Sequence, residues 1–354
     1  MSAVPVHLTG TTWPGTAPGG LPRYFADLFA ALRLCADLDV GATAFGDPEP
    51  GGDSWGPAAG GTASRVRASR RPAPVGTAVL DRHFALFGPA PRGAALVTHF
   101  HGPWAQESAA AGEGRAAVAV KALVERARYR GSDRFVVLSQ AFADVLVARY
   151  GADRGAIAVI PPGVDLTRFT ATPVPDGPPR VLCVRRLERR MGIDVLLRAW
   201  PAVLARHPGA RLDVVGDGSQ RRALQQHASD LGITDTVTFV GTIDDADLAR
   251  RYAAATLTAV PSVAWEGFGL VALESLASGR APVVTDVGGL PDAVRDLAAD
   301  LVVSAGDPDA LADRLAAGLD GVRPSAQDCR AHAERFSWGV AAARHAALYR
   351  AVAA

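Results

Sequence analysis

The sequence predicts an α/β protein with two doubly wound parallel sheets. Short apolar runs typical of buried strands alternate with longer runs at helical spacing through both halves of the chain. At 354 residues the chain is too long for one ordinary core. A polar, proline-rich stretch, Thr170–Pro179, resembles a hinge. We therefore expect an N-terminal domain over residues 1–172 and a C-terminal domain over residues 173–338.

Composition and charge exclude several classes of protein. Hydrophobic residues make up 49% of the chain and charged residues 21%, as in soluble globular proteins. A net charge of +1 creates no global field that would favour nucleic acid or an anionic membrane. No apolar stretch is long enough to span a bilayer, and no signal peptide is evident. The three scattered cysteines fit a reducing compartment, so we expect a cytoplasmic protein, with its oligomeric state left open.

In the first half, a glycine-rich loop, Gly10–Pro22, separates the first expected strand from the first expected helix. A second segment, Pro48–Pro74, is rich in Gly, Pro, Ala, Ser and Arg and predicts a mobile loop. That loop either lies near a substrate site or has no role. The other expected elements of this half are the strands Pro5–Thr9, Ala94–Phe100, Arg134–Leu138 and Ala156–Ile160 and the helices Tyr24–Leu34, Ala116–Tyr129 and Ser139–Tyr150.

The second half repeats the alternation of strands and helices. Its expected strands are Arg180–Val184, Arg211–Val215, Thr236–Val240, Thr256–Pro261 and Ala281–Thr285. Its expected helices are Ile193–Leu204, Gln220–Leu231, Asp247–Ala255, Leu270–Ser278, Ala310–Gly318 and Arg330–Ala353.

Histidines gather where the strand Ala94–Phe100 ends, in the run His-Phe-His-Gly-Pro-Trp. His99 and His101 alternate and so point to one face if the strand continues that far. They could form a metal pair, but no third ligand stands at a suitable spacing, so we predict no metal site. His83, alone in an apolar run, is interpreted as structural.

The strongest functional signal lies in Val260–Asp292. A buried strand is followed by a loop with Glu266, then Gly267-Phe268-Gly269, then a helix from Leu270. Glycines at such a place let backbone N–H groups approach an anion, and the start of the helix adds a favourable dipole. Glu266 and Glu274 are separated by seven residues, and carboxylates bond well to neighbouring hydroxyls. This arrangement suits a sugar and a ribose on either side of a diphosphate.

The run Glu266-Gly267-Phe268-Gly269-Leu270 with Glu274 resembles the E-x7-E motif of glycosyltransferase family 4, the retaining enzymes of GT-B fold. The resemblance implies two Rossmann-like domains that face a central cleft, with the terminal helix 339–354 returning to the first domain. It implies that Glu266 contacts the hydroxyls of the donor sugar and that Glu274 contacts the ribose. The backbone of Gly267, Phe268, Gly269 and Leu270 would contact the diphosphate.

The same resemblance assigns further residues. Gly20, in the run Pro-Gly-Gly-Leu-Pro-Arg-Tyr, would lie near the donor diphosphate, His101 would contact the donor sugar, and the region of Gly241 would meet the base. Arg186 matches the diphosphate-binding Arg of the family's G-R-L-x-x-x-K-G pattern.

The chain departs from that pattern twice. Arg185 stands where the family usually has Gly, and Met191 where it usually has Lys. A thioether cannot neutralise a phosphate, so Arg189 or Arg190 would have to supply the second cation, and we select Arg190.

The resulting hypothesis is retaining transfer of a hexose-type sugar from a nucleoside diphosphate sugar to a hydroxyl of a small molecule or glycan, in bacterial secondary-metabolite (antibiotic) or glycan biosynthesis. The sugar nucleotide is a co-substrate, and no cofactor or metal is expected. Two alternatives stay open. One is a phosphorylase or epimerase on the same fold, and the other is a non-catalytic nucleotide-sugar binding protein, since Met191 removes a usual charge.

Overall fold

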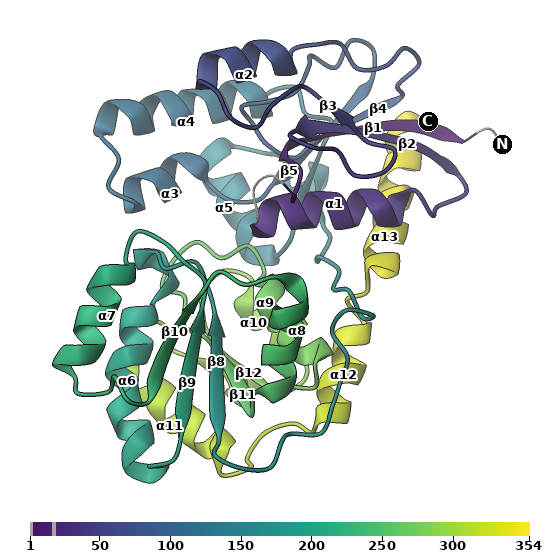
Figure 1. Ribbon diagram of the computed structural model, residues 1–354. Helices are drawn as coiled ribbons and strands as arrows, with labels where there is room; N and C mark the ends of the chain where they lie inside the picture. Colours follow the sequence, from purple (N-terminus) through teal and green to yellow (C-terminus); the bar gives the residue numbers. More distant parts are fainter. Residues whose placement is uncertain (1–2, 16–18) are drawn as a thin grey trace. The chain divides into compact units, whose positions relative to one another are not determined.

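A computed structural model describes residues 3–15 and 19–354. The chain forms two compact units. Unit 1 comprises Met1–Gly163 with Trp338–Ala354, and unit 2 comprises Val164–Ser337 (Figure 1). We expected the domain boundary after residue 172, but in the structure residues 164–172 already belong to unit 2. There the Arg280 guanidinium donates to the carbonyl of Thr172 at 2.6 Å.

Unit 1 is built on a seven-stranded sheet whose order is β3-β2-β1-β4-β5-β6-β7 and whose pairs are all parallel. Chain order therefore reverses direction between β1 and β4, which is the switch point where doubly wound sheets bind ligands. The strands are β1 Val4–Thr12, β2 Leu38–Phe45, β3 Asp53–Ser54, β4 Val79–Arg82, β5 Ala95–Phe100, β6 Arg134–Val137 and β7 Ile157–Val159.

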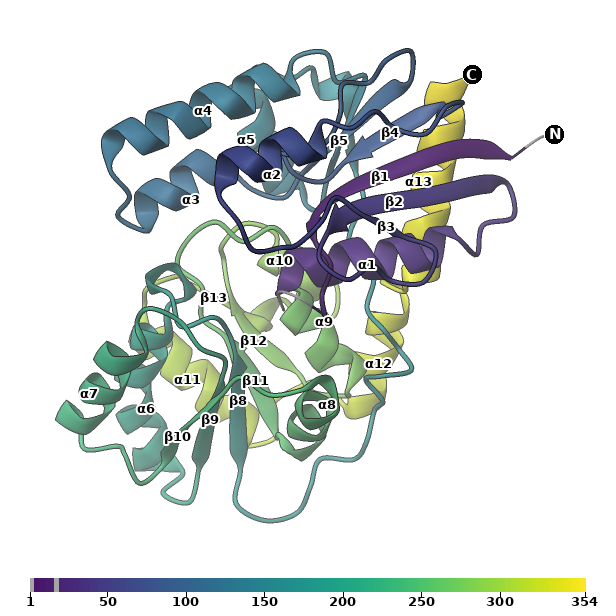
Figure 2. The same cartoon turned by 45° about the horizontal axis from the view of Figure 1, so that its top comes forward.

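Helices cover this sheet. The first helix and the C-terminal helix of unit 1 pack together and contact β1, although they lie at opposite ends of the sequence (Figure 2). Helix α5 shows how local sequence sets helix ends: Ser139 Oγ accepts from the Phe142 N–H at the start, and Gly151 adopts a left-handed φ of 68° at the end. The helices are α1 Gly20–Leu32, α2 Thr62–Ser69, α3 Trp104–Ala110, α4 Arg115–Tyr129, α5 Gln140–Tyr150 and α13 Trp338–Ala353.

Unit 2 contains a six-stranded parallel sheet of order β10-β9-β8-β11-β12-β13 (Figure 2). Its switch point lies between β8 and β11. The strands are β8 Arg180–Val184, β9 Arg211–Val215, β10 Val237–Gly241, β11 Leu257–Val260, β12 Pro282–Thr285 and β13 Val302–Val303. The prediction of two doubly wound parallel sheets is thus confirmed.

The core of unit 2 is formed by the apolar faces of these strands and of the helices over them, and it includes the fully buried Trp200. The helices are α6 Ile193–Arg206, α7 Arg221–Asp230, α8 Asp245–Ala254, α9 Leu270–Ala277, α10 Leu290–Val294, α11 Pro308–Leu319 and α12 Ala326–Glu334. None of the helices in the described ranges has the length and apolar character needed to cross a membrane.

Two predicted elements are wrong. The segment Pro48–Pro74 is not simply a loop, because it contains β3 and α2. Its order comes from packing: the Arg65 guanidinium lies 4.5 Å from the centre of the Phe45 ring and 4.8 Å from that of Phe87. The helical run expected over Arg330–Ala353 is two helices, α12 and α13, because the chain passes from unit 2 to unit 1 between them. The second of these is the terminal helix that the resemblance implied for the first domain.

Candidate functional site

The candidate site of unit 2 starts at its switch point. Because β8 and β11 are parallel neighbours, the loops that follow them leave the same edge of the sheet. Glycines allow these loops, and the loop after β9, to pack closely. A Cβ on Gly216 would lie 2.1 Å from the Arg185 carbonyl oxygen, and one on Gly192 would lie 1.9 Å from that of Pro261. The residues after β8 are therefore held against the residues after β11.

Arg185 and Glu266 form the centre of this site. Nη2 of Arg185 donates both to Oε2 of Glu266 and to Oγ of Ser262, and Ser262 Oγ in turn lies 3.3 Å from the same carboxylate oxygen. The two charged side chains are only 7% and 15% exposed. Burial opposes ionisation of Glu266, but the charges of Arg185 and Arg190 and the hydrogen bonds hold its pKa below the ordinary value. Glu266 is therefore a carboxylate at neutral pH.

The backbone around Glu266 is held on two sides. Trp265 has a φ of 48°, the one positive φ at a non-glycine position among the described residues, and Arg190 Nη1 donates to its carbonyl at 2.8 Å. From the turn after β12, the Gly289 N–H donates to the Glu266 carbonyl at 3.0 Å. A Cβ on Gly288 would lie 1.9 Å from that same oxygen.

Helix α9 follows directly. It begins after Gly269, whose φ of 91° favours glycine, and a Cβ there would lie 2.4 Å from a methyl of Leu290. The first N–H groups of a helix have no acceptor within it and form its positive end. The Phe268 side chain is buried against Phe336, with ring centres 5.5 Å apart, so it is the backbone of this residue that can meet a ligand.

Glu274 lies one turn inside α9. It is 5% exposed, and the Tyr252 hydroxyl donates to its Oε2 at 2.9 Å. Glu274 is thus on the helix that follows the glycine loop, but its side chain is buried. Its predicted contact with the ribose remains a prediction.

The remaining predicted residues of unit 2 are divided between surface and core. Arg186, directly after β8, is exposed, as is Arg189. Met191 is 5% exposed and belongs to the hydrophobic core, so no cation is present at the position of the family lysine. Arg190 is the cation whose head group reaches the Glu266 loop. Gly241 ends β10, and its carbonyl accepts from the Gly216 N–H at 2.9 Å.

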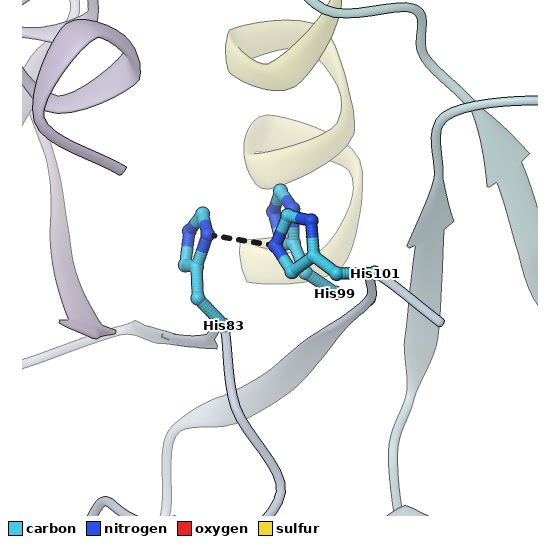
Figure 3. Close-up of side chains that lie close together, drawn as sticks. All are labelled: His83, His99 and His101. Carbon is cyan, nitrogen blue, oxygen red and sulfur yellow. Dashed lines mark hydrogen bonds between the residues drawn. The ribbon is translucent and has the colours of Figure 1, made fainter. Parts of the chain in front are cut away.

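In unit 1, Gly20 is exposed at the start of α1, and three histidines lie where two neighbouring strands end. His83 follows β4, His99 is in β5 and His101 follows it; Figure 3 shows the three rings close together in front of α13. His101 Nε2 lies 3.3 Å from His83 Nδ1, and His99 Nε2 lies 3.0 Å from Asp81 Oδ2. We call His83, His99 and His101 the three-histidine cluster.

Asp81 sets the charge state of this region. It is fully buried, and burial would raise its pKa, but His99 and His83 hold that pKa well below its usual range. The Tyr349 hydroxyl of α13 also donates to its Oδ2. Burial lowers the pKa of His99 to about 3 and that of His101 well below its ordinary value. At neutral pH the region therefore contains one carboxylate and uncharged imidazoles at positions 99 and 101.

Sequence reasoning missed three features of these sites. Arg185 was noted only as a departure from a glycine, whereas its guanidinium contacts Glu266. Ser262 was not singled out. His83 was considered structural because it is isolated in the sequence, and only the pairing of β4 with β5 brings it to His99 and His101.

Comparison with known proteins shows the family. Residues 54–168 match a model described as Glycosyltransferase Family 4, and residues 167–336 match one described as Glycosyl transferases group 1. A D-inositol 3-phosphate glycosyltransferase of Nocardia farcinica is 40% identical over 263 residues, covering 69% of this chain and 58% of that protein. A protein of the same name from Acidothermus cellulolyticus is 35% identical over 304 residues, covering 78% of this chain and 68% of that protein. The chain thus spans little more than half the length of the first relative.

Solved structures share the fold. Sucrose-phosphate synthase from Thermosynechococcus elongatus superposes with a TM-score of 0.81 at 24% identity, covering 98% of both chains. Anabaena HepE, solved in complex with UDP-glucose, gives 0.73 at 18% identity, covering 98% of this chain and 99% of HepE. With the parallel sheets of both units, these matches establish the GT-B fold. The chain belongs to the group 1 glycosyltransferases of family 4.

Proposed function

We propose that this protein is a retaining glycosyltransferase that moves a sugar from a nucleoside diphosphate sugar to a hydroxyl acceptor. In the reaction, the bond between the anomeric carbon and the donor phosphate oxygen breaks. The acceptor oxygen bonds to that carbon from the same face, and its proton passes to a phosphate oxygen of the departing diphosphate. The chain must therefore stabilise negative charge on the diphosphate and hold the sugar.

The observation that carries this proposal is the ionised Glu266 beside the positive end of α9 at the switch point of unit 2. Arg185 and Ser262 both bond to Oε2 of Glu266, so Oε1 is the oxygen that remains to accept from a sugar hydroxyl. The N–H groups of Gly269 and Leu270 at the helix start suit the diphosphate. Arg186, exposed after β8, and Arg190, beside the Glu266 loop, supply cations for it.

Four further residues would contact other parts of the donor. Glu274 is assigned to the ribose, the region of Gly241 to the base, Gly20 to the diphosphate and His101 to the donor sugar. The names of the relatives make inositol phosphate the first acceptor to test, and the HepE complex makes UDP-glucose the first donor. We further propose that the donated sugar is a hexose and that the protein acts in bacterial secondary metabolism or glycan assembly.

The first test is thermal unfolding with UDP-, GDP-, ADP- and dTDP-sugars. A ligand at a hundred times its dissociation constant stabilises the folded protein by about 2.7 kcal/mol. We expect one nucleotide class to raise the melting temperature of the wild type but not of Arg186→Ala. Arg206→Ala is the matched control, since Arg206 is half-exposed at the far end of α6. Absence of any shift, or an equal shift in Arg186→Ala, would contradict the assignment.

Turnover separates transfer from the alternatives. With the donor found, we expect glycosylated product from an inositol phosphate or another polyol, with the anomeric configuration retained. Glu266→Gln should lower kcat by about a hundredfold to a thousandfold, the usual cost of losing one such contact. Binding without turnover against an acceptor panel would instead support a non-catalytic nucleotide-sugar binding protein, the alternative that the buried Met191 favours.

A further inference from the structure

The three-histidine cluster has the composition of a metal site, and the proposed function does not use it as one. The proposed transfer uses His101 as a contact to the sugar and gives no task to His83 or His99. Yet one ligand atom from each of the three residues lies within 4.8 Å of the others, and His83 and His99 are almost completely buried. Among the described residues, no other group of three or more His, Cys, Asp and Glu side chains has its ligand atoms this close together.

Two nitrogens of the cluster already have the separation that a metal requires. His83 Nδ1 and His101 Nε2 are 3.3 Å apart. Two imidazole nitrogens at about 2.0–2.1 Å from one tetrahedral Zn²⁺ lie about 3.3–3.4 Å from each other. In the metal-free protein a single proton lies between these two nitrogens, and a metal ion would replace it.

Asp81 contacts His99, the third residue of the cluster, and orients its ring. His99 Nε2 lies 3.0 Å from Asp81 Oδ2, the separation of an N–H that donates to a carboxylate oxygen, so this nitrogen bears the proton. His99 Nδ1 is then a bare acceptor, and it is buried without a hydrogen-bond partner in the part of the chain that the structure describes. A carboxylate behind a histidine is the usual support of a metal-binding imidazole, because it fixes the tautomer and raises the basicity of the ring.

We propose that His83, His99 and His101 bind a divalent transition-metal ion such as Zn²⁺. Three imidazoles and no thiolate suit Zn²⁺, Co²⁺, Ni²⁺ or Cu²⁺, and a fourth position stays open to water. The His83 and His99 rings stack with their centres 3.8 Å apart. A metal lies near the plane of each ring that binds it, so binding turns at least one of these two rings out of the stack.

The site has a consequence for transfer, and this step rests on the proposed function. His101 is assigned to the donor sugar, and its Nε2 would be taken by the metal. Occupation of the cluster would then withdraw His101 from the donor, so Zn²⁺ would inhibit transfer in competition with the nucleotide sugar.

The experiment uses the full chain, freed of metal by a chelator and desalted. Zn²⁺ is titrated by calorimetry, and Co²⁺ is followed by its visible ligand-field bands. We expect one ion per chain at neutral pH, with the intense bands of tetrahedral Co²⁺. His83→Ala, His99→Ala and His101→Ala should each lower the affinity by at least about tenfold. His227→Ala, at a half-buried histidine of α7 in unit 2, should leave the affinity unchanged.

Circular dichroism checks that each variant folds, and half-buried His101 is the position where substitution disturbs packing least. Failure to bind one ion per chain would overturn the proposal, as would equal affinity in His101→Ala and the wild type. A Co²⁺ spectrum with thiolate charge-transfer bands would assign the metal to cysteine and overturn it equally. Binding is measured without turnover, so a protein that binds Zn²⁺ but transfers no sugar even in its metal-free form would refute the proposed function and leave the metal site standing.

Discussion

Arg185 shows how one departure from a family pattern changes a site. Where relatives usually have a glycine, this chain places a guanidinium that is 7% exposed and bonded to Glu266. Because Glu266 is paired, its folded-state pKa lies below its unfolded value, so its contribution to stability is present above about pH 4.3 and is lost as the pH falls further.

At this scale we predict that Arg185→Gln lowers the free energy of unfolding by about 3 kcal/mol, because it leaves a largely buried carboxylate without its cation. The double variant Arg185→Gln/Glu266→Gln should regain most of that stability, since no unpaired charge remains, but not the transferase activity. Chemical denaturation and turnover of the three proteins measure this. Equal stabilities of the single and double variants would contradict the prediction.

At the scale of elements, the loops after β8, β11 and β12 depend on close backbone contacts. Gly288 is the sharpest case, because it has a φ of 56° and its Cα faces the Glu266 carbonyl, which a Cβ would approach to 1.9 Å. The loop that carries Glu266 can occupy its position only while this site has no side chain.

Gly288→Ala should therefore reduce both stability and transfer. Gly306→Ala is the matched control, because Gly306 also has a positive φ, 76°, but a Cβ there would meet nothing within 4 Å. Both variants suffer the left-handed backbone strain of about 1–2 kcal/mol, and only Gly288→Ala adds the clash. Unfolding free energies and kcat of the pair decide the question: if they lose equal amounts, the contact with Glu266 does not matter.

At the scale of the whole molecule, acid sensitivity should come from unit 1. His345 on α13 is fully buried, stacks on His99 with ring centres 5.3 Å apart, and has its pKa lowered by burial to about 4. The unfolded chain binds a proton at this residue near pH 6.5, whereas the folded protein does not until about pH 4. Its contribution to stability is therefore complete above pH 6.5 and is lost on acidification through that range.

We predict that the free energy of unfolding of the wild type falls between pH 6.5 and pH 4. In His345→Phe, which keeps an aromatic ring without a titrating group, the slope should be smaller by up to about 1.4 kcal/mol per pH unit. Denaturant unfolding across this range provides the measurement, and His227→Phe, outside the cluster, is the control. A slope in His345→Phe that equals the wild-type slope would contradict the prediction.

The sequence by itself determined the two doubly wound sheets and the loop of Glu266 and the glycines. Both depend on residues close together in the chain: apolar periodicity selects strands and helices, and a strand end, a glycine turn and a helix start come consecutively. It failed at Pro48–Pro74 and at Arg330–Ala353, where composition and periodicity indicated a loop and one helix and long-range packing produced other elements.

Only the tertiary structure decided which side chains meet. Arg185 contacts Glu266 and His83 joins His99 and His101 because parallel pairing brings the ends of separate strands to one edge of a sheet. Burial of Glu274 and Met191 depends in the same way on helices packed from elsewhere in the chain. Spacing along the sequence contains no information on that pairing, so it could identify the glycine loop of the site but not the partner of its carboxylate or the third histidine of the cluster.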